Sequence, residues 1–228
     1  MTDWFAGDVA ARYDSSTAGM PAEPVVDFLL PLAGGGALEL AIGTGRIAVP
    51  LAARGVRVAG IDLSPDMVAE LRKKTDEIPV ELGDMTVTKV DGTFSVVYIV
   101  FNSISNQTTQ EGQVATFANA AAHLESGGCF VVEVGTKNRK HLEVFDLSDT
   151  HVGIDEYDAD TQRLVSHHFN LRDGSWRRLS MPFRSASHGE FDLMAQLAGL
   201  RLRERWGDWD RSPFSADSTK HVSVWEKP

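Results

Sequence analysis

The sequence has little cysteine, a shortage of basic charge and no long apolar run. Its 228 residues include a single cysteine, Cys129, which excludes an internal disulfide and a zinc site built from several cysteines. No apolar stretch reaches the roughly 18 residues that a membrane-spanning helix needs. The first residues contain an acid and no basic, apolar leader pattern. These absences favour a protein that acts in the cytoplasm and does not bind a membrane.

Acidic side chains outnumber basic ones by 32 to 22, which gives a formal net charge of −10 at pH 7. A surplus of negative charge repels phosphate backbones, so broad binding to nucleic acid is disfavoured, as is an anionic membrane surface. The hydrophobic fraction of 43% is close to the globular average and suffices for a buried core. We therefore expect one folded unit that binds a small molecule, and a homo-oligomer remains open.

Strand-like and helix-like segments alternate through most of the chain. Apolar, β-rich segments predict buried strands at 37–42, 56–61, 79–82, 94–101 and 129–134. Capping residues and helical spacing predict intervening helices at 46–53, 66–74 and 111–124. This alternation indicates an α/β fold with a doubly wound, mostly parallel sheet and right-handed crossovers.

The pattern changes after about residue 138. Segments 152–157, 163–171 and 176–183 read as strands, and turn signals rather than helices separate them. We expect residues 138–187 to form an antiparallel β insertion that caps the substrate site. A helix at 190–198 and a strand pair at 200–206 and 221–225 then close the chain.

The predicted organisation therefore has three parts. Residues 34–137 and 188–228 form the cofactor-binding core, and the insertion caps it. Residues 1–33 precede the core with predicted helices at 3–13 and 23–32. Trp4, Phe5, Val9 and Tyr13 give the first helix an apolar stripe, which fits either a docked helix or a lid over a site.

The most informative segment joins the first predicted strand to the first core helix through a glycine-rich turn. Gly43 and Gly45 permit a tight turn and a close approach of a ligand to the backbone. Asp62 ends the next strand, where its carboxylate can accept hydrogen bonds from both hydroxyls of a ribose. A further acid, Asp84, follows the third strand.

Two cofactor classes fit this arrangement. The run from Gly43 to Ala48 satisfies the dinucleotide fingerprint G-x-G-x-x-G/A, so an NAD-dependent oxidoreductase is one interpretation. Glu39 lies inside the first strand, four residues before Gly43, and its carboxylate has the wrong sign for a pyrophosphate but suits a cationic ligand. The chain also leaves little room for the separate substrate domain that such oxidoreductases normally carry.

Taken together, Glu39-x-x-x-Gly43-x-Gly45, Asp62 and Gly83-Asp84 resemble the motifs of class I S-adenosylmethionine-dependent methyltransferases of the small-molecule type. The resemblance implies a seven-stranded Rossmann-like sheet whose last strand is antiparallel. It implies S-adenosylmethionine as cofactor and S-adenosylhomocysteine as its product. A narrower likeness to bacterial natural-product N-methyltransferases, some of which modify amino sugars, suggests a transferase of antibiotic biosynthesis.

The resemblance also implies roles for single residues in the cofactor site. Glu39 would lie near the methionine ammonium, Asp62 would hold the ribose hydroxyls, and Asp84 would accept from the adenine amino group. The other cofactor-site candidates are Ala41, Gly43, Gly45, Arg46, Leu63, Met85 and Phe101. Ala41 stands where many members have glycine, and Arg46 either meets the cofactor carboxylate or is an exposed first-turn arginine.

Tyr13 and Asn102 are the candidates for the reaction itself. Residues 11–14 resemble the Tyr-Asp segment of small-molecule members, in which the tyrosine closes over the methyl donor. Phe101 and Asn102 stand where substrate meets cofactor in that group. No clustered Asp/Asp/Asn set for a metal is evident, so we expect metal-independent, in-line N-methylation of an amine, with O-methylation as the alternative.

Several charged and basic side chains are interpreted as structural. His167 and His168 are adjacent on a predicted strand and so face opposite sides, which favours solvated or packed rings over a catalytic base. His151 has no partner at metal-ligand spacing. Glu70 lies three and four residues before Lys73 and Lys74, a spacing that predicts two ion pairs on a helix surface.

Overall fold

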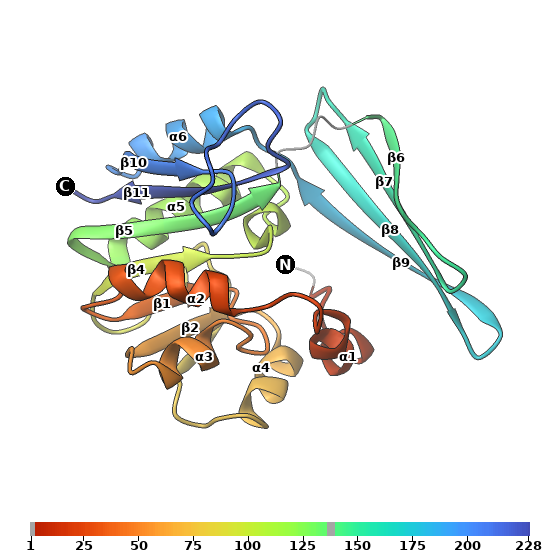
Figure 1. Ribbon diagram of the computed structural model, residues 1–228, viewed down its shortest axis with the longest axis horizontal. Coiled ribbons are helices and arrows are strands. Elements are labelled where there is room, and N and C mark those ends of the chain that lie inside the picture. Colours follow the sequence, from red (N-terminus) through yellow and green to blue (C-terminus); the bar gives the residue numbers. More distant parts are fainter. Residues whose placement is uncertain (1–2, 136–139) are drawn as a thin grey trace.

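A computed structural model describes residues 3–135 and 140–228 of the chain (Figure 1). Seven strands form the central sheet: β1 (Ala37–Leu40), β2 (Val58–Asp62), β3 (Val80–Leu82), β4 (Phe94–Ile99), β5 (Leu124–Gly135), β10 (Arg201–Trp206) and β11 (Lys220–Glu226). Their order is β10-β11-β5-β4-β1-β2-β3, and β11 runs antiparallel to both of its neighbours while the other pairs are parallel. This confirms the predicted doubly wound, mostly parallel sheet with an antiparallel closing strand.

Helices cover both faces of the sheet. One apolar core contains side chains of α2 (Glu23–Leu29), α3 (Ala48–Ala53) and α4 (Pro65–Arg72). The other contains side chains of α5 (Gln110–His123) and α6 (His188–Leu197), among them the fully buried Phe117 and Phe191. Because β1, β2 and β4 are buried almost throughout, their sequences are nearly all apolar, and the charged residues Glu39 and Asp62 are exceptions.

Some helix boundaries differ from the predicted ones for local backbone reasons. The first helix, α1 (Asp8–Ser16), begins after Gly7, whose φ of 59° lies outside the helical region. The second ends at Leu29 and tightens into a 3₁₀ turn, η1 (Leu30–Leu32), because Pro31 cannot continue an α-helix. The core helix predicted from residue 46 begins at Ala48, since Gly45 is left-handed with φ 76°.

A second sheet of four antiparallel strands projects from the core as a cap (Figure 1). Its strands in order are β6 (Leu142–Leu147), β7 (His151–Asp158), β8 (Arg163–Arg172) and β9 (Ser175–Arg184). Three of the four were predicted, and β6 was missed because a register shift between Val144 and Asp146 interrupts its alternation. The predicted boundary at residues 137 and 138 lies outside the described residues.

The cap is fixed to the core by buried polar contacts at its base. Arg184, at the end of β9, forms an ion pair with Glu190 of α6 and donates a hydrogen bond of 2.6 Å to Gln113 Oε1 of α5. Its side chain is only 7% exposed, so these partners compensate for a buried charge. At the opposite end of the cap, Arg172 lies 3.6 Å from Asp8 of α1. This end of the cap therefore contacts the N-terminal helix.

His221 of β11 is a buried histidine between the central sheet and α6. The ring is fully buried, Nδ1 shares a 2.8 Å hydrogen bond with Ser223 Oγ, and Nε2 finds no partner among the described residues. Burial lowers the pKa of His221 to about 3, against 6.5 for an exposed imidazole. Between these two pH values the unfolded chain binds a proton that the folded chain does not, so stability falls as pH falls.

We expect His221→Leu to flatten this dependence. Urea denaturation of the wild type should show a free energy of unfolding that decreases from pH 6.5 toward pH 3 more steeply than that of His221→Leu. Equal slopes for the two proteins would show that His221 is not the buried neutral base described here.

Candidate active site

The carboxyl ends of β1, β2, β3 and β4 open into one pocket. The chain leaves β1 toward β2 and later returns to its other side as β4, so the loops after these strands diverge and leave a crevice. The space between the lining residues is about 950 Å³, a figure that includes open solvent. The pocket therefore forms where the loops after β1 and β4 diverge.

Most of the predicted site residues line this pocket, namely Tyr13, Glu39, Ala41, Gly43, Arg46, Asp62, Leu63, Asp84, Met85 and Phe101. Gly45 and Asn102 are not among the lining residues. A Cβ atom at Gly45 would lie 2.0 Å from Leu71 Cδ1, so this glycine lets α4 pack against the loop. Asn102 Oδ1 accepts a 2.6 Å hydrogen bond from the Gly135 N–H and thereby joins the ends of β4 and β5.

The pocket is also lined by residues that were not among the candidate site residues. They are Asp3, Trp4, Phe5, Ile42, Thr44, Ile47, Ile61, Ser64, Met67, Gly83, Val100, Ser103, Asn106 and Gln107. The apolar stripe of the N-terminal segment signals Trp4 and Phe5. The turn η2 (Ser103–Asn106), which follows the predicted acceptor segment at Phe101 and Asn102, brings Ser103 and Asn106 to the pocket.

The turn after β1 has an unusual backbone. Ala41, Gly43 and Gly45 are all left-handed, with φ values of 62°, 56° and 76°. Glycine adopts this conformation at little cost, whereas an alanine there is strained by about 1–2 kcal/mol. The alanine at position 41, where glycine would be unstrained, therefore holds backbone strain beside the pocket. The small size of its side chain does not remove this strain.

Asp62 holds this turn against the end of β2. Its Oδ2 accepts a 2.6 Å hydrogen bond from the Gly43 N–H, and its Oδ1 accepts one of 2.8 Å from the Ser64 N–H. Burial raises the pKa of Asp62, while these backbone donors act in the opposite direction. The carboxylate is thus fixed in orientation at the pocket wall, and each oxygen has a second lone pair that can accept from a ligand hydroxyl.

Glu39 is the most unfavourably placed charge in the pocket. Its residue exposure is 2%, and its Oε2 accepts a 3.0 Å hydrogen bond from the Tyr98 hydroxyl of β4. Burial raises the pKa of Glu39 to about 8, with Tyr98 and Arg46 acting to lower it. A carboxylate desolvated in this way is strongly favoured to ionise only when a cation lies against it. The pocket is therefore suited to a positively charged ligand.

The far rim of the pocket is formed by the segments after β3 and β4. Asp84 Oδ1 accepts hydrogen bonds from the N–H and the hydroxyl of Thr86, at 2.9 and 2.8 Å, and from Gln107 Nε2 at 3.3 Å. Phe101 and Asn102 are both left-handed, with φ 55° and 61°. Two consecutive strained residues at the end of a strand are typical of positions that present groups to a ligand.

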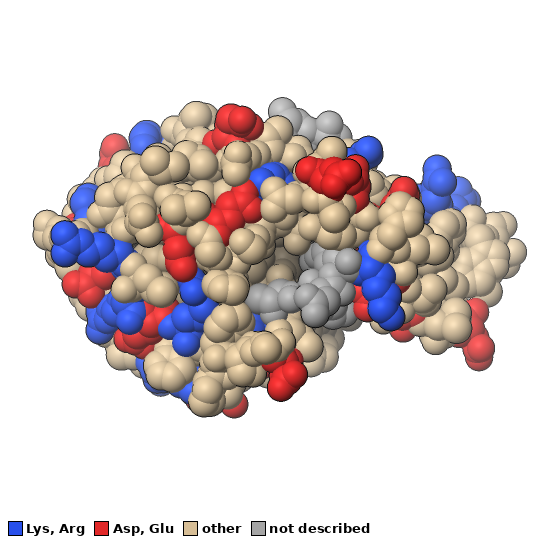
Figure 2. Space-filling model, turned by 90° about the horizontal axis from the view of Figure 1, so that it is seen from above, with Lys and Arg blue, Asp and Glu red and all other residues tan. Residues whose placement is uncertain are grey.

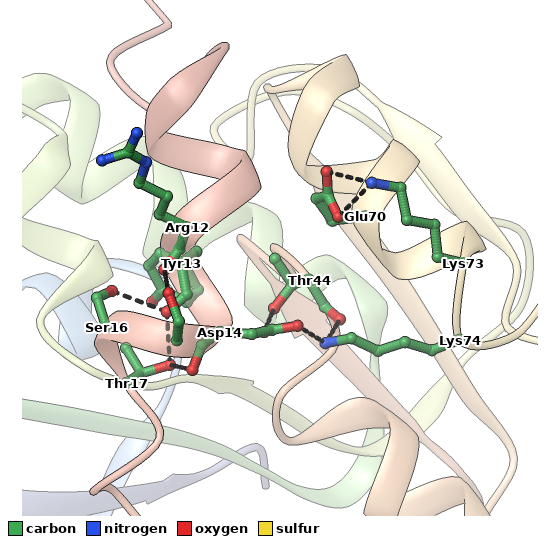
Figure 3. Close-up of polar contacts among 10 residues, drawn as sticks. Arg12, Tyr13, Asp14, Ser16, Thr17, Thr44, Glu70, Lys73 and Lys74 are labelled. Carbon is green, nitrogen blue, oxygen red and sulfur yellow. Dashed lines mark hydrogen bonds and ion pairs between the residues drawn. The ribbon is translucent and has the colours of Figure 1, made fainter.

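The N-terminal helix is clasped to the glycine turn (Figure 3). Asp14 Oδ1 accepts a 2.6 Å hydrogen bond from the Thr44 hydroxyl, and Asp14 Oδ2 pairs with Lys74 Nζ at 2.5 Å. Lys74 Nζ also donates to the Thr44 carbonyl at 2.9 Å. We call Asp14, Thr44 and Lys74 the lid clasp, because it fixes Tyr13 of α1 at the pocket.

The lid clasp corrects one prediction. Glu70 forms the predicted ion pair with Lys73, at 2.7 Å, but Lys74 turns away from Glu70 toward Asp14 (Figure 3). Lys74 follows the end of α4 rather than lying within it, so helical spacing does not apply to it. The start of α1 is tied to the same helix, since the Gly7 N–H donates to Asp66 Oδ2 at 2.6 Å.

Among residues 3–135 and 140–228, no three His, Cys, Asp or Glu side chains are grouped so as to hold a metal ion. No helix in this part of the chain is long and apolar enough to cross a membrane.

Comparisons with known proteins agree on one family. A family model described as "Methyltransferase domain" matches residues 37–128. The solved CcbJ methyltransferase from Streptomyces caelestis is similar over 99% of both chains, with 32% identity and a TM-score of 0.88. The dTDP-3-amino-3,4,6-trideoxy-alpha-D-glucopyranose N,N-dimethyltransferase of Streptomyces venezuelae is 31% identical over 153 residues, spanning 67% of this chain and 62% of that enzyme. The cypemycin N-terminal methyltransferase of a Streptomyces species is 27% identical over 210 residues, 86% of this chain and 85% of that enzyme.

The two adjacent lysines allow a matched test of the lid clasp. Lys74→Met removes both contacts with Asp14 and Thr44, whereas Lys73→Met removes only the surface pair with Glu70. Partly exposed contacts of this kind contribute about 1 kcal/mol, so amide exchange in α1 should be about fivefold faster in Lys74→Met. Hydrogen–deuterium exchange of the full chain measures this. Equal exchange of α1 in the two variants would contradict the clasp.

Proposed function

Because the chain belongs to the class I S-adenosylmethionine-dependent methyltransferases, we propose that it methylates an amine nitrogen of a small molecule in natural-product metabolism. The observation that carries the proposal is the buried Glu39 carboxyl group in the pocket wall, whose charged form is favoured by a cationic ligand. Nitrogen as the acceptor is supported by the two related Streptomyces enzymes, one an N,N-dimethyltransferase for an amino sugar and one a methyltransferase for a peptide N-terminus.

The residues of the pocket fit S-adenosylmethionine, which when bound supplies an electrophilic methyl group on a sulfonium. Glu39 would hold the ammonium of the cofactor. Asp62, fixed by two backbone N–H groups, would accept from the ribose hydroxyls. Asp84, held by Thr86 and Gln107, would accept from the adenine amino group. These roles give one carboxylate to each donor-bearing part of the cofactor.

The protein's contribution to the reaction is mainly orientation. An amine attacks in line only when its lone pair lies about 3 Å behind the methyl group, and holding that geometry can lower the barrier by about 7–11 kcal/mol. Tyr13 lines the pocket and would close it, and the lid clasp supports this role by holding α1 to the glycine turn. Burial raises the pKa of the Tyr13 phenol, so it keeps its proton near neutral pH and acts as a hydrogen-bond donor and wall rather than as a base. Asn102, which joins β4 to β5, would act by positioning the segment that meets the acceptor.

The sequence left two alternatives open, an NAD-dependent oxidoreductase and an O-methyltransferase. The dinucleotide interpretation of the glycine turn is set aside, since the chain belongs to the methyltransferase family and Glu39 would oppose a pyrophosphate. O-methylation of an alcohol or phenol keeps the same pocket and needs a base for its acceptor. A cytoplasmic location and a homo-oligomeric state stay predictions.

A product screen tests the proposal. The wild-type chain is incubated with methyl-labelled S-adenosylmethionine and a panel of amines, amino sugars and phenols, and products are identified by mass spectrometry. We expect label on nitrogen of at least one amine and none with Asp62→Ala, because loss of the ribose contact weakens cofactor binding. Label on phenolic oxygen alone would favour O-methylation. Binding of S-adenosylmethionine with no transfer to any amine would contradict the proposal.

A further inference from the structure

The two faces of the cap sheet differ in chemistry. Residues paired across neighbouring strands share a face, and successive residues of one strand face opposite sides. The face that contains Arg172 is directed toward α1, where Arg172 lies 3.6 Å from Asp8, and it includes the buried Leu164. We call the opposite face the outer face. It contains His167, whereas His168 lies on the face directed toward α1, so the predicted opposite orientation of these two rings is confirmed.

The outer face is mostly apolar and open to solvent. Leu147, Val152 and Phe169 form one row across β6, β7 and β8, and Trp176 lies beside the turn that joins β8 to β9. The exposed fractions of Leu147 and Trp176 are 75% and 51%. Of the outer-face residues in the described part of the chain, only Arg184 at the base is buried.

An apolar sheet face of this kind is typical of an interaction surface, because an antiparallel sheet normally places polar residues on its solvated side. Four strands about 4.8 Å apart and eight residues long, as in β7, give a face of about 19 by 27 Å. Two copies would bury about 1,000 Å², which reaches the lower limit for a specific interface. The cap protrudes at the right of the space-filling view, and most of its surface on that side is uncharged (Figure 2).

Two exposed charges on the outer face are placed so that the face complements a second copy of itself. Glu156 of β7 is in register with Val165 of β8, and Arg178 of β9 is in register with Phe169 of β8. His167 therefore lies midway between the two charges, one strand and one row from each. When two outer faces are placed together about a two-fold axis that passes His167 in the plane between them, Arg178 of each copy meets Glu156 of the other.

The same rotation also matches apolar side chains. It places Trp176 of one copy against Leu142 of the other, and Phe169 against Ile154. The charged row at the base of the cap falls outside the overlap. The strands of the two copies then cross steeply, as in the orthogonal class of sheet packing.

We propose that two copies of this chain associate through the outer faces of their caps, with Arg178 of each copy paired with Glu156 of the other. A second copy is the partner because an isologous interface needs a face that complements itself, and opposite charges at positions exchanged by the two-fold axis meet that need. No residue of the cap lines the cofactor pocket among the described residues, so the inference is independent of the proposed function.

Charge reversal on the two faces gives a matched pair of variants. Arg178→Glu places like charges together twice in the dimer, whereas Arg177→Glu makes the same change on the opposite face of β9. In sedimentation-velocity experiments on the full chain, wild type and Arg177→Glu should form a dimer of the same affinity. The dissociation constant of Arg178→Glu should be at least about 100-fold higher.

A second reversal tests the pairing itself. Glu156 and Arg178 of one chain are two strands and two rows apart, about 17 Å between their Cα atoms, which is too far for a contact within the chain. The double variant Glu156→Arg, Arg178→Glu should therefore restore the dimer, because the charges are exchanged across the interface. A monomeric wild type would overturn the proposal, and so would equal dissociation constants for Arg178→Glu and Arg177→Glu or a double variant as weak as Arg178→Glu.

Discussion

The buried carboxylate of Glu39 sets the conditions for the rest of the site. It lies within β1 of the mostly parallel sheet, with the Tyr98 hydroxyl as its neutral partner, and burial raises its pKa to about 8. Such a group destabilises the sheet whenever it is ionised without a cation. The free protein therefore holds Glu39 mostly protonated at neutral pH, and a cationic ligand is the partner that makes the charged form favourable. A cationic nucleoside is therefore favoured over a dinucleotide at this pocket.

The elements around this carboxylate are joined by polar contacts rather than by chain continuity. Asp62 fixes the glycine turn, and the lid clasp then fixes α1 to the same turn through Asp14 and Lys74. The cap is held at its base by the buried Arg184. These contacts join core, lid and cap to one another.

Features of the fold and the pocket that depend on neighbouring residues could be predicted from the sequence, whereas contacts between distant residues could not. The strands, the glycine turn and the three carboxylates Glu39, Asp62 and Asp84 are signalled by local pattern, because apolar runs and turn residues act over a few positions. The partner of Lys74 lies 60 residues earlier in the chain, at Asp14, and local helical spacing pointed instead to Glu70. No short-range signal distinguishes these two partners.

The cap also contains features that local sequence patterns do not predict. The bulge at Phe145 removes the alternation by which β6 would be found, and the hydrogen bonds that join Asp146, His151 and His168 arise only from the register of three strands. The left-handed backbone of Ala41 was also beyond reach, since an alanine carries no sequence signal for it. Sequence patterns therefore identify residues that the fold brings to one pocket, whereas the contacts that close this pocket depend on tertiary structure.

Calorimetry with S-adenosylmethionine tests the role of Glu39 most directly. With a pKa of about 8 in the free chain, Glu39 must lose its proton when the cofactor's ammonium binds, so affinity should rise with pH up to about 8. At pH 7 the apparent enthalpy should depend on the ionisation enthalpy of the buffer, with close to one proton released. Glu39→Gln should bind about 10–100-fold more weakly and release none. A buffer-independent enthalpy for the wild type, or the same proton release from Glu39→Gln, would contradict the account.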